Sequence, residues 1–181
     1  KVNSNFKISI ITVSFNSVIT IRDTIESIIS QDYNNIEYII IDAGSNDGTL
    51  DIIKEYKEHI SYFISEADNG IYDGMNKGIA AATGDIVGIL NSDDFYPNSF
   101  VISNVASTFE KQVCDAVYGD LVYVKFFDID KIVRYWKSGN YTIYKIKNGW
   151  MLPHPTFFVK KHLYDKYGYY NTDLKTAADY E

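Results

Sequence analysis

Short apolar runs alternate with segments of helical periodicity through the first two thirds of the chain. The predicted strands are residues 8–13, 38–41, 62–64, 86–90 and 116–118. Apolar side chains recur every three or four positions in the predicted helices, which are residues 21–29, 50–60, 71–82 and 100–109. Strands that are almost continuously apolar and alternate with helices are typical of a parallel sheet with helices on both faces. We therefore predict an α/β fold with a mostly parallel, Rossmann-like sheet.

The pattern becomes irregular after about residue 120. Residues 123–136 read as extended or hairpin structure, and residues 148–155, which contain Gly, Pro and Trp, read as a loop. No linker or repeat separates this part from the rest. We expect one domain over residues 1–181, with a regular half, 1–120, and an irregular half, 121–181.

Composition and charge narrow the class of protein. The net charge is −7, and nucleic-acid binders need a basic face, so we expect no nucleic-acid partner. No apolar stretch approaches the length of a membrane span. The single cysteine, Cys114, reads as a small packed side chain. The chain begins at Lys1 without methionine and stops at Glu181 without a terminating signal, so we expect a piece of a longer protein.

Polar side chains follow three of the predicted strands at the points where they end. Residues 14–16 follow the first strand, Asp42 ends the second, and Asp93 and Asp94 follow the fourth. Ligands of open parallel sheets bind outside the carboxyl ends of the strands, so these groups are expected along one edge. Adjacent carboxylates repel each other, and the divalent cations Mg²⁺ and Mn²⁺ prefer such oxygen ligands. The pair predicts a metal site.

The sequence lacks the usual glycine-rich phosphate loops. No G-x-G-x-x-G follows the first strand, and no G-x-x-x-x-G-K-S/T occurs anywhere. If a phosphate-bearing ligand binds, the metal is its expected principal partner.

The sequence resembles the inverting glycosyltransferases of family 2, which have the GT-A fold. The first two motifs are residues 8–16 (ISIITVSFN) and 41–49 (IDAGSNDGT). The central motifs are residues 66–78 (EADNGIYDGMNKG), 82–85 (ATGD) and the DxD-type 90–94 (LNSDD). The last two are residues 153–157 (PHPTF) and 178–181 (ADYE). The matches run in order over nearly the whole chain.

The resemblance implies a transferase that moves a sugar from a nucleoside diphosphate to an acceptor hydroxyl. It assigns residues 1–120 to the nucleotide-sugar and residues 121–181 to the acceptor. Asp93 is expected near the ribose, and Asp94 is expected to hold Mn²⁺ or Mg²⁺. The side chains expected to line or face the nucleotide pocket are Thr12, Phe15, Asp42, Asp68 and Lys77.

The catalytic base implied by the resemblance is Asp179, with Asp173 as the next candidate. A carboxylate that takes the proton of the acceptor hydroxyl permits one in-line displacement with inversion. His154, held between two prolines, reads either as a packed loop residue or as a third metal ligand or diphosphate contact. Trp150 reads as a sugar-stacking ring or a loop anchor.

One position departs from the family pattern, and it concerns the nucleotide base. Many members carry a second aspartate after the one at Asp42, where this chain has Ala43. Asp42 can still accept a hydrogen bond from the imide N–H of uracil, and UDP is a frequent donor of the family. The expected donor is therefore a UDP-sugar rather than a GDP-sugar.

Two alternatives to a transferase remain open at this point. A sugar-phosphate nucleotidyltransferase also uses paired aspartates and Mg²⁺, although it usually carries a glycine-rich basic loop that residues 14–22 lack. A nucleotide-sugar-binding domain without activity is the other. For a transferase, the expected acceptor is a saccharide or lipid-linked saccharide of surface polysaccharide or glycolipid synthesis, and the expected location is the cytoplasm or the inner face of the membrane.

Overall fold

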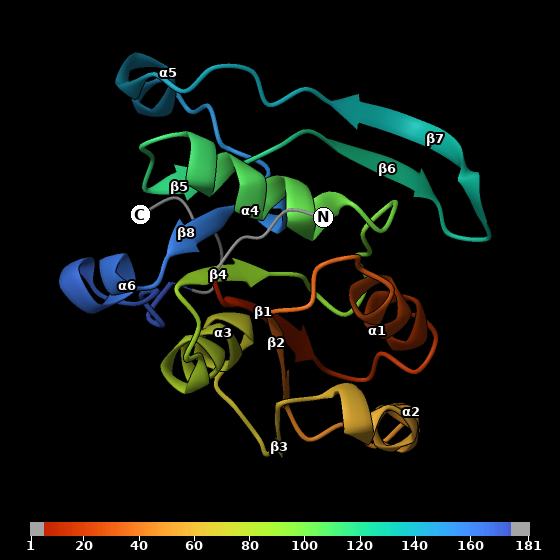
Figure 1. Cartoon of the computed structure of the whole chain (residues 1–181). Coiled ribbons are helices and arrows are strands. Elements are labelled where there is room, and N and C mark those ends of the chain that lie inside the picture. The colour runs from red at the N-terminus through yellow and green to blue at the C-terminus, as the bar shows by residue number, and fades with distance from the viewer. Residues whose placement is uncertain (1–5, 175–181) are drawn as a thin grey trace.

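The computed structural model describes residues 6–174 and contains two sheets. The larger sheet has six strands in the order β3-β2-β1-β4-β8-β5 (Figure 1). Its strands are β1 (Ile8–Ser14), β2 (Ile36–Asp42), β3 (Tyr62–Ser65), β4 (Ile86–Ile89), β5 (Ala116–Val117) and β8 (Phe158–Lys160). The first four run parallel to one another. Their carboxyl ends therefore share one edge, as the alternating pattern predicts.

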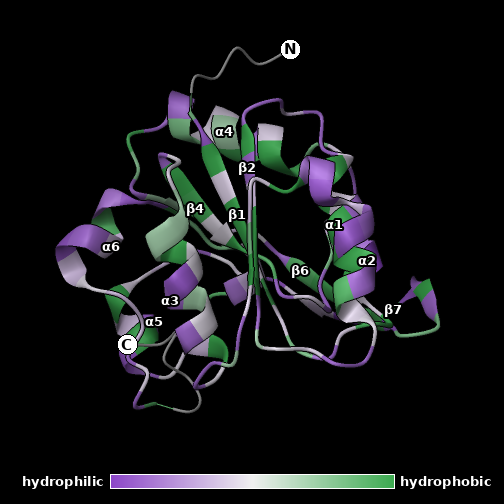
Figure 2. Ribbon diagram, turned by 90° about the horizontal axis from the view of Figure 1, so that it is seen from below, coloured by the Kyte–Doolittle hydropathy of each residue, from purple (hydrophilic) through white to green (hydrophobic). Residues whose placement is uncertain are grey.

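Helices cover both faces of the larger sheet, which confirms the predicted fold class. The main helices are α1 (Ile21–Ile29), α2 (Thr49–Glu55), α3 (Ile71–Ala81), α4 (Val101–Lys111) and α6 (His162–Tyr167). α1, α2 and α4 pack on one face through a buried cluster, while α3 packs on the other with α6 beside it. Figure 2 shows the apolar strands enclosed between these two layers.

Alternating side chains of β1 supply both layers of the core. Ile8 and Ile10 face α1 and α4, and Ile11 and Val13 face α3. This follows from the two-residue period of a strand. All four side chains are buried, which is why the run reads as continuously apolar in the sequence.

Close packing places α3 against β1 at one end of the sheet. A Cβ at Gly78 would clash with the side chain of Ile11, and one at Gly74 would lie 3.3 Å from Val13 Cγ1. Only glycine permits this approach. The first turn of α3 is thereby brought to the carboxyl edge of the sheet, where the predicted site lies.

The irregular half contributes to the larger sheet as well as to the second one. β8 inserts between β4 and β5 and runs antiparallel to both. β6 (Leu121–Lys125) and β7 (Asp128–Trp136) form the predicted hairpin, which stands apart from the larger sheet. It is followed by α5 (Ile143–Lys147), and β7 and α5 lie along the same side of the molecule (Figure 1).

Short turns of 3₁₀-helix complete the regular structure of the described residues. η1 (Lys57–His59) follows α2, so the predicted helix 50–60 is in fact broken after Glu55. η2 (His154–Thr156) lies within the predicted loop. In the region from residue 6 to residue 174, no helix has both the length and the apolar character needed to cross a bilayer.

Candidate active site

An open cavity of about 920 Å³ lies at the carboxyl edge of the larger sheet. Its walls are the loops after β1, β2, β3 and β4 and the start of α3. Residues of its lining include Val13, Phe15, Asn16, Ser17, Ile19, Ala43, Asp68, Gly70, Ile71, Asn91, Ser92 and Asp93. Segments distant in sequence therefore meet at one site, as the strand ends predict.

The loop after β1 carries the most exposed ring of the cavity. Phe15 lines the wall and is 62% exposed. Asn16 follows with a left-handed backbone (φ 49°), which is uncommon outside glycine. An exposed aromatic face in a cavity can stack on a planar group such as a nucleotide base.

Asn16 is held in this conformation by the loop after β2. Its side-chain carbonyl accepts a hydrogen bond from Asn46 N–H (3.0 Å), and its own N–H donates to Ser45 Oγ (2.8 Å). The Ser45 hydroxyl in turn donates to Asp42 Oδ1. This Asp42–Ser45–Asn16 network joins the two loops into one unit behind the cavity.

Asp42 lies behind the cavity wall. Its carboxylate is fully buried and also accepts hydrogen bonds from the N–H groups of Gly44 and Ser45 and from the Ser65 hydroxyl. A direct contact between Asp42 and a base stays a prediction. The observed contacts give Asp42 a different task, which is to hold the loops that shape the cavity.

The structure corrects the expectation that Thr12 lines the pocket. The side chain of Thr12 is buried, and its hydroxyl accepts a hydrogen bond from Tyr38 (3.2 Å). Because side chains of a strand alternate between faces, the next residue, Val13, reaches the cavity instead.

Asp68 and Lys77 occupy different positions relative to the cavity. Asp68 lines it, and its Oδ1 accepts a hydrogen bond from Gly70 N–H (2.9 Å) just before α3. Lys77 is not part of the lining. It forms ion pairs with Glu66 (2.9 Å) and Asp73 (3.6 Å), which raise its pKa.

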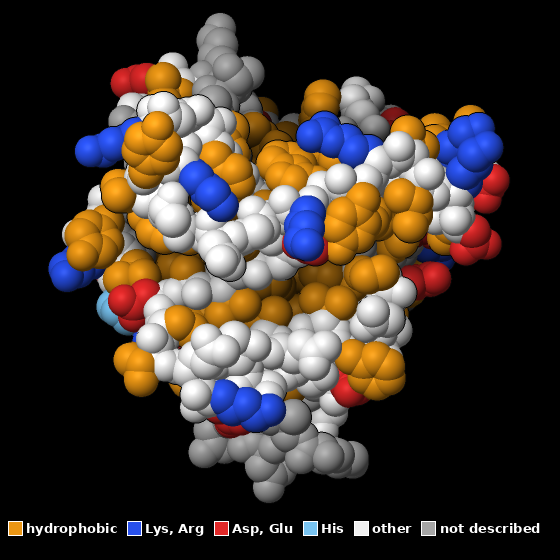
Figure 3. Space-filling view, turned by 90° about the horizontal axis from the view of Figure 1, so that it is seen from above, with side chains coloured by type: hydrophobic (Ala, Val, Ile, Leu, Met, Phe, Trp, Pro, Cys, Tyr) orange, Lys and Arg blue, Asp and Glu red, His pale blue; other side chains and the backbone are white. Residues whose placement is uncertain are grey.

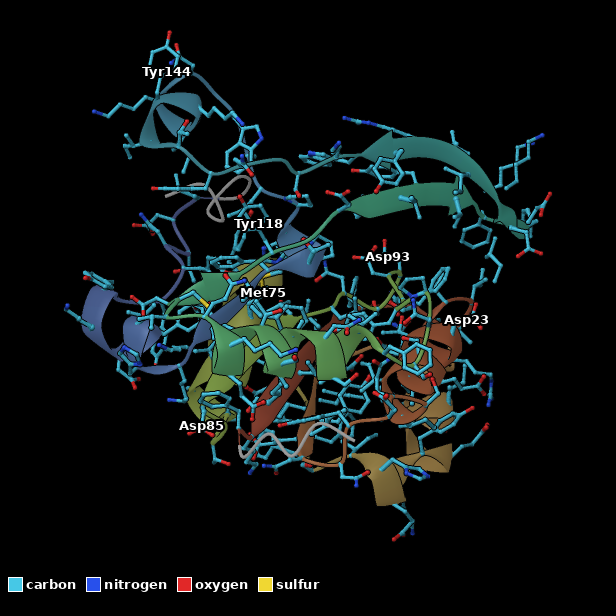
Figure 4. All side chains as sticks on the ribbon, turned by 45° about the horizontal axis from the view of Figure 1, so that its top comes forward. Asp23, Met75, Asp85, Asp93, Tyr118 and Tyr144 are labelled. Carbon is cyan, nitrogen blue, oxygen red and sulfur yellow. The ribbon has the colours of Figure 1, made fainter. Side chains whose placement is uncertain are left out.

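The two adjacent aspartates differ in environment. Asp93 is exposed on the lining of the cavity, on a loop beneath the β6–β7 hairpin (Figure 4). Asp94 is largely buried; this burial and the charge of Asp93 raise the pKa of its carboxyl to about 6. Its backbone carbonyl is fixed by the hydroxyl of Thr24 (2.7 Å).

The chemistry of this pair fits a divalent cation. Within residues 6–174, neither carboxylate accepts a hydrogen bond or forms an ion pair, and partial burial beside Asp93 disfavours the charged form of Asp94. A cation would relieve both the repulsion and the burial. No group of three or more His, Cys, Asp or Glu residues gathers in the described part of the chain. Donor phosphates and water would have to complete the coordination.

His154 is not among the residues that line the cavity, although its element η2 packs against β4. It belongs to η2, and its ring meets the edge of Tyr170 at 6.2 Å between centroids. Its role as a metal ligand or diphosphate contact stays a prediction. Trp150 packs edge-on against Tyr118, with Lys145 Nζ 5.7 Å from its ring centre, so it anchors a loop in this structure.

Asp179 lies outside the described residues. The next candidate, Asp173, is exposed, and its N–H donates to the side chain of Asn171. The segment before it is fixed to α3, because Asn76 exchanges two hydrogen bonds with the backbone of Tyr170. The chain thus returns to the helix that borders the cavity.

Several cavity residues were not singled out by the sequence. These are Val13, Ser17, Ile19, Gly70, Ile71, Asn91 and Ser92. Most of them lie inside or next to the motifs that contain the predicted site residues. Their place in those motifs could have identified them as cavity residues.

The mostly parallel sheet, with a paired carboxylate at the end of β4, is the GT-A fold of the glycosyltransferases. The chain belongs to glycosyl transferase family 2, whose model matches residues 9–168. This membership counts against the nucleotidyltransferase alternative.

Relatives and solved structures agree with this membership. An uncharacterized glycosyltransferase of Mycobacterium tuberculosis is 31% identical over 179 residues, covering 96% of this chain and 66% of the relative. A PGL/p-HBAD biosynthesis glycosyltransferase of Mycobacterium bovis is 26% identical over 177 residues, with the same coverage. The chain thus spans slightly less than two thirds of the length of these relatives.

Two solved structures share the fold. Residues 1–349 of TarS from S. aureus, in complex with UDP, superpose with a TM-score of 0.77 at 23% identity, covering 96% of this chain and 53% of that fragment. The mannosyltransferase PcManGT of Pyrobaculum calidifontis, in complex with GDP-Man and Mn²⁺, gives 0.72 at 18% identity, covering 96% and 50%.

Proposed function

We propose that this chain is the donor-binding part of an inverting glycosyltransferase that moves a sugar from a UDP-sugar to an acceptor hydroxyl with the help of Mn²⁺ or Mg²⁺. The observation that carries the proposal is the Asp93–Asp94 pair at the cavity. Partial burial and the charge of Asp93 disfavour the ionised form of Asp94, and a divalent cation brought by a ligand would offset that cost.

The cavity suits a nucleoside diphosphate sugar. Its volume lies within the usual range for small-molecule sites. Phe15 offers a ring on one wall, and Asp93 offers a hydrogen-bond acceptor for a ribose hydroxyl on another. TarS has been solved with UDP and with UDP-GlcNAc, which supports a uridine donor. PcManGT with GDP-Man keeps a guanosine donor as the second candidate.

The proposed reaction is a single displacement. The acceptor oxygen attacks the anomeric carbon of the sugar while the bond from that carbon to the diphosphate breaks. Asp179 takes the hydroxyl proton, and the electron pair of the broken bond leaves on UDP. A divalent cation held by Asp94 would offset the charge that grows on the diphosphate.

We further propose that the acceptor is a saccharide or lipid-linked saccharide of a surface polysaccharide or glycolipid. The relatives named for PGL/p-HBAD biosynthesis favour the glycolipid. A lipid-linked acceptor would place the protein in the cytoplasm at the inner face of the membrane.

The test is UDP release from a panel of UDP-sugars and acceptors by the wild type and by Asp179→Asn. We expect the substitution to lower transfer by about 10²–10⁴-fold, the usual worth of a positioned base. UDP binding should stay unchanged, because Asp179 does not belong to the donor cavity in this account. Transfer by Asp179→Asn at the wild-type rate would place the base elsewhere, with Asp173 tested next.

The same assay separates the remaining alternatives. UDP binding without transfer to any acceptor would favour a binding domain without activity. Pyrophosphate release from UTP and a sugar phosphate would identify a nucleotidyltransferase.

A further inference from the structure

Positive charge is concentrated in one segment of this acidic chain. Residues 131–164 contain seven of the 17 Lys and Arg residues and none of the 24 Asp and Glu residues. Five of the seven lie on β7, on α5 or between them: Lys131, Arg134, Lys137, Lys145 and Lys147. The net charge of −7 does not reveal this local excess of positive charge. Such an excess is typical of a surface that binds an anionic partner.

None of the five cations forms an ion pair with a carboxylate within residues 6–174, although Lys137 lies close enough to Asp120 to help lower the pKa of its carboxyl. The ion pairs among residues 6–174 involve other lysines and Arg22, including Lys160 and Lys161 farther along the segment. Lys145 donates to the carbonyl of Asn140, and Arg134 lies over the rings of Tyr123 and Trp136, at 5.4 and 5.3 Å. These contacts orient the two side chains and leave their charge in place.

Apolar and aromatic side chains are exposed among these cations. On β7 they are Ile132, Val133 and Tyr135, and around α5 they are Tyr141, Ile143 and Tyr144. Tyr144 is 73% exposed and points away from the body of the molecule (Figure 4). A tyrosine with an apolar ring and a polar tip suits a boundary between water and lipid.

β7 and α5 lie along the same side of the molecule (Figure 1). Figure 3 looks down on that face and shows Lys and Arg side chains scattered among hydrophobic ones over the half that holds α5 and the hairpin. Acidic side chains are fewer in this view (Figure 3). The segment carries Asp128 and Asp130 at the start of β7, and the carboxylate of Asp120 accepts hydrogen bonds from Tyr135 and Ser138. We call this face, residues 131–147, the basic aromatic face.

We propose that the basic aromatic face docks on an anionic membrane surface. The cations match the charge of acidic phospholipid headgroups, and each contributes to binding near such a surface. The exposed rings and aliphatic side chains match the headgroup boundary. A soluble polyanion would match the charge and leave these apolar side chains in water, so the membrane accounts for both features.

The proposal has a bearing on substrate access. The hairpin stands above the loop of Asp93, so a membrane at this face would lie on the same side of the molecule as the donor cavity (Figure 4). Docking on a membrane requires no transferase activity. The membrane proposal can therefore be tested independently of the proposed transferase function.

The test is co-sedimentation of the protein with vesicles. Vesicles of phosphatidylcholine mixed with phosphatidylglycerol are compared with vesicles of phosphatidylcholine alone, at low and high salt. We expect binding to the anionic vesicles only, weakened by salt. Lys131→Glu with Lys147→Glu should weaken it about tenfold or more, given the usual contribution of each basic residue. Tyr144→Ser should weaken it as well.

The matched control is Lys54→Glu with Lys57→Glu. It makes the same change of charge on exposed side chains of α2 and η1, on the opposite side of the molecule (Figure 1). It should leave vesicle binding unchanged. UDP binding and the unfolding temperature of each variant show that the fold is intact.

Four outcomes would overturn the proposal. The first is equal binding to both kinds of vesicle. The second is equal weakening by the control. The third is no binding to anionic vesicles. The fourth is binding that glycerol phosphate or inorganic phosphate displaces, which would indicate a site for soluble phosphate groups.

Discussion

The carboxyl group of Asp94 lies where burial and the charge of Asp93 disfavour its ionisation. Its folded pKa of about 6 lies above the ordinary value of 3.8. Ionisation therefore favours the unfolded chain: the penalty is absent below about pH 4, grows up to about pH 6 and is complete above it. Functional carboxylates often carry such a cost, because the ligand that removes it binds later.

We predict that Asp94→Asn stabilises the metal-free protein at about pH 8, by on the order of 1–3 kcal/mol. The gain should shrink as the pH falls toward about 4, where the wild-type carboxyl is protonated. Urea unfolding in the presence of a chelator measures it. Asp130→Asn, which changes an exposed carboxylate of β7, is the control. A loss of stability at high pH would show that Asp94 has a stabilising partner.

Ser45 is the link between a buried carboxylate and the wall of the cavity. Its hydroxyl donates a hydrogen bond to Asp42 and accepts one from the backbone N–H of Asn16. The left-handed backbone conformation of Asn16 is one that glycine adopts more readily than asparagine. A direct reading of the sequence assigns Asp42 to the ligand. In the folded chain its carboxylate accepts hydrogen bonds from the loop after β2 and from Ser65, and its contact with a ligand stays a prediction.

We predict that Ser45→Ala weakens UDP binding by about 5–30-fold, since it removes two hydrogen bonds that hold the cavity wall. The maximal rate of transfer should change little, because Ser45 does not approach the reacting atoms. Calorimetric titration of UDP measures the first effect and initial rates measure the second. Ser103→Ala on α4 is the control. A variant that is less stable yet binds UDP normally would limit the network to folding.

Individual elements were predictable where their pattern is local. The parallel strands and the helices α1, α3 and α4 follow directly from apolar periodicity. Each of these helices buries one stripe of side chains, and the central strands bury side chains on both faces. The hairpin of β6 and β7 was also expected. The antiparallel insertion of β8 was not, because it depends on Phe158 packing where Gly88 of β4 has no side chain.

The site was predictable in outline for the same reason. The carboxyl ends of parallel strands share one edge of the sheet. The sequence therefore predicted correctly that the loops after these strands lie together. The sequence of a fully buried strand does not reveal which residues face which layer, so Thr12 was chosen in place of Val13.

The opposite end of the sheet contains a buried network that ties three elements together. Glu37 of β2 accepts hydrogen bonds from Lys7, from Ser9 of β1 and from Thr83, which follows α3. Burial alone raises the pKa of Glu37, yet these bonds outweigh it and lower the pKa to about 2. The stabilisation is therefore complete above about pH 4.5 and is lost as the pH falls toward 2.

We predict that Glu37→Gln destabilises the protein at about pH 7, by on the order of 2–3 kcal/mol. The difference from the wild type should narrow at about pH 3, where the wild-type network is being protonated. Urea unfolding at both pH values measures the change. Glu55→Gln removes an exposed ion pair with Arg22 and should cost less than about 1 kcal/mol. A cost of Glu37→Gln that does not vary with pH would rule out the linkage.

The molecule as a whole combines an open cavity at the carboxyl edge of its sheet with a hairpin that stands over that edge. The family is established by the match of residues 9–168 to glycosyl transferase family 2, and the fold is shared with TarS. What the chain does with its cavity depends on the acidic pair. If Asp94 holds a divalent cation for a nucleoside diphosphate, then metal and nucleotide must bind cooperatively.

Calorimetric titration of UDP in the presence of Mn²⁺ and in the presence of EDTA tests this most directly. We predict that Mn²⁺ strengthens UDP binding by about tenfold or more, ~1.4 kcal/mol, in the wild type. Asp94→Asn should bind UDP with the same affinity in both conditions, while Asp130→Asn should behave as the wild type. Equal affinity of the wild type in Mn²⁺ and in EDTA would contradict the account.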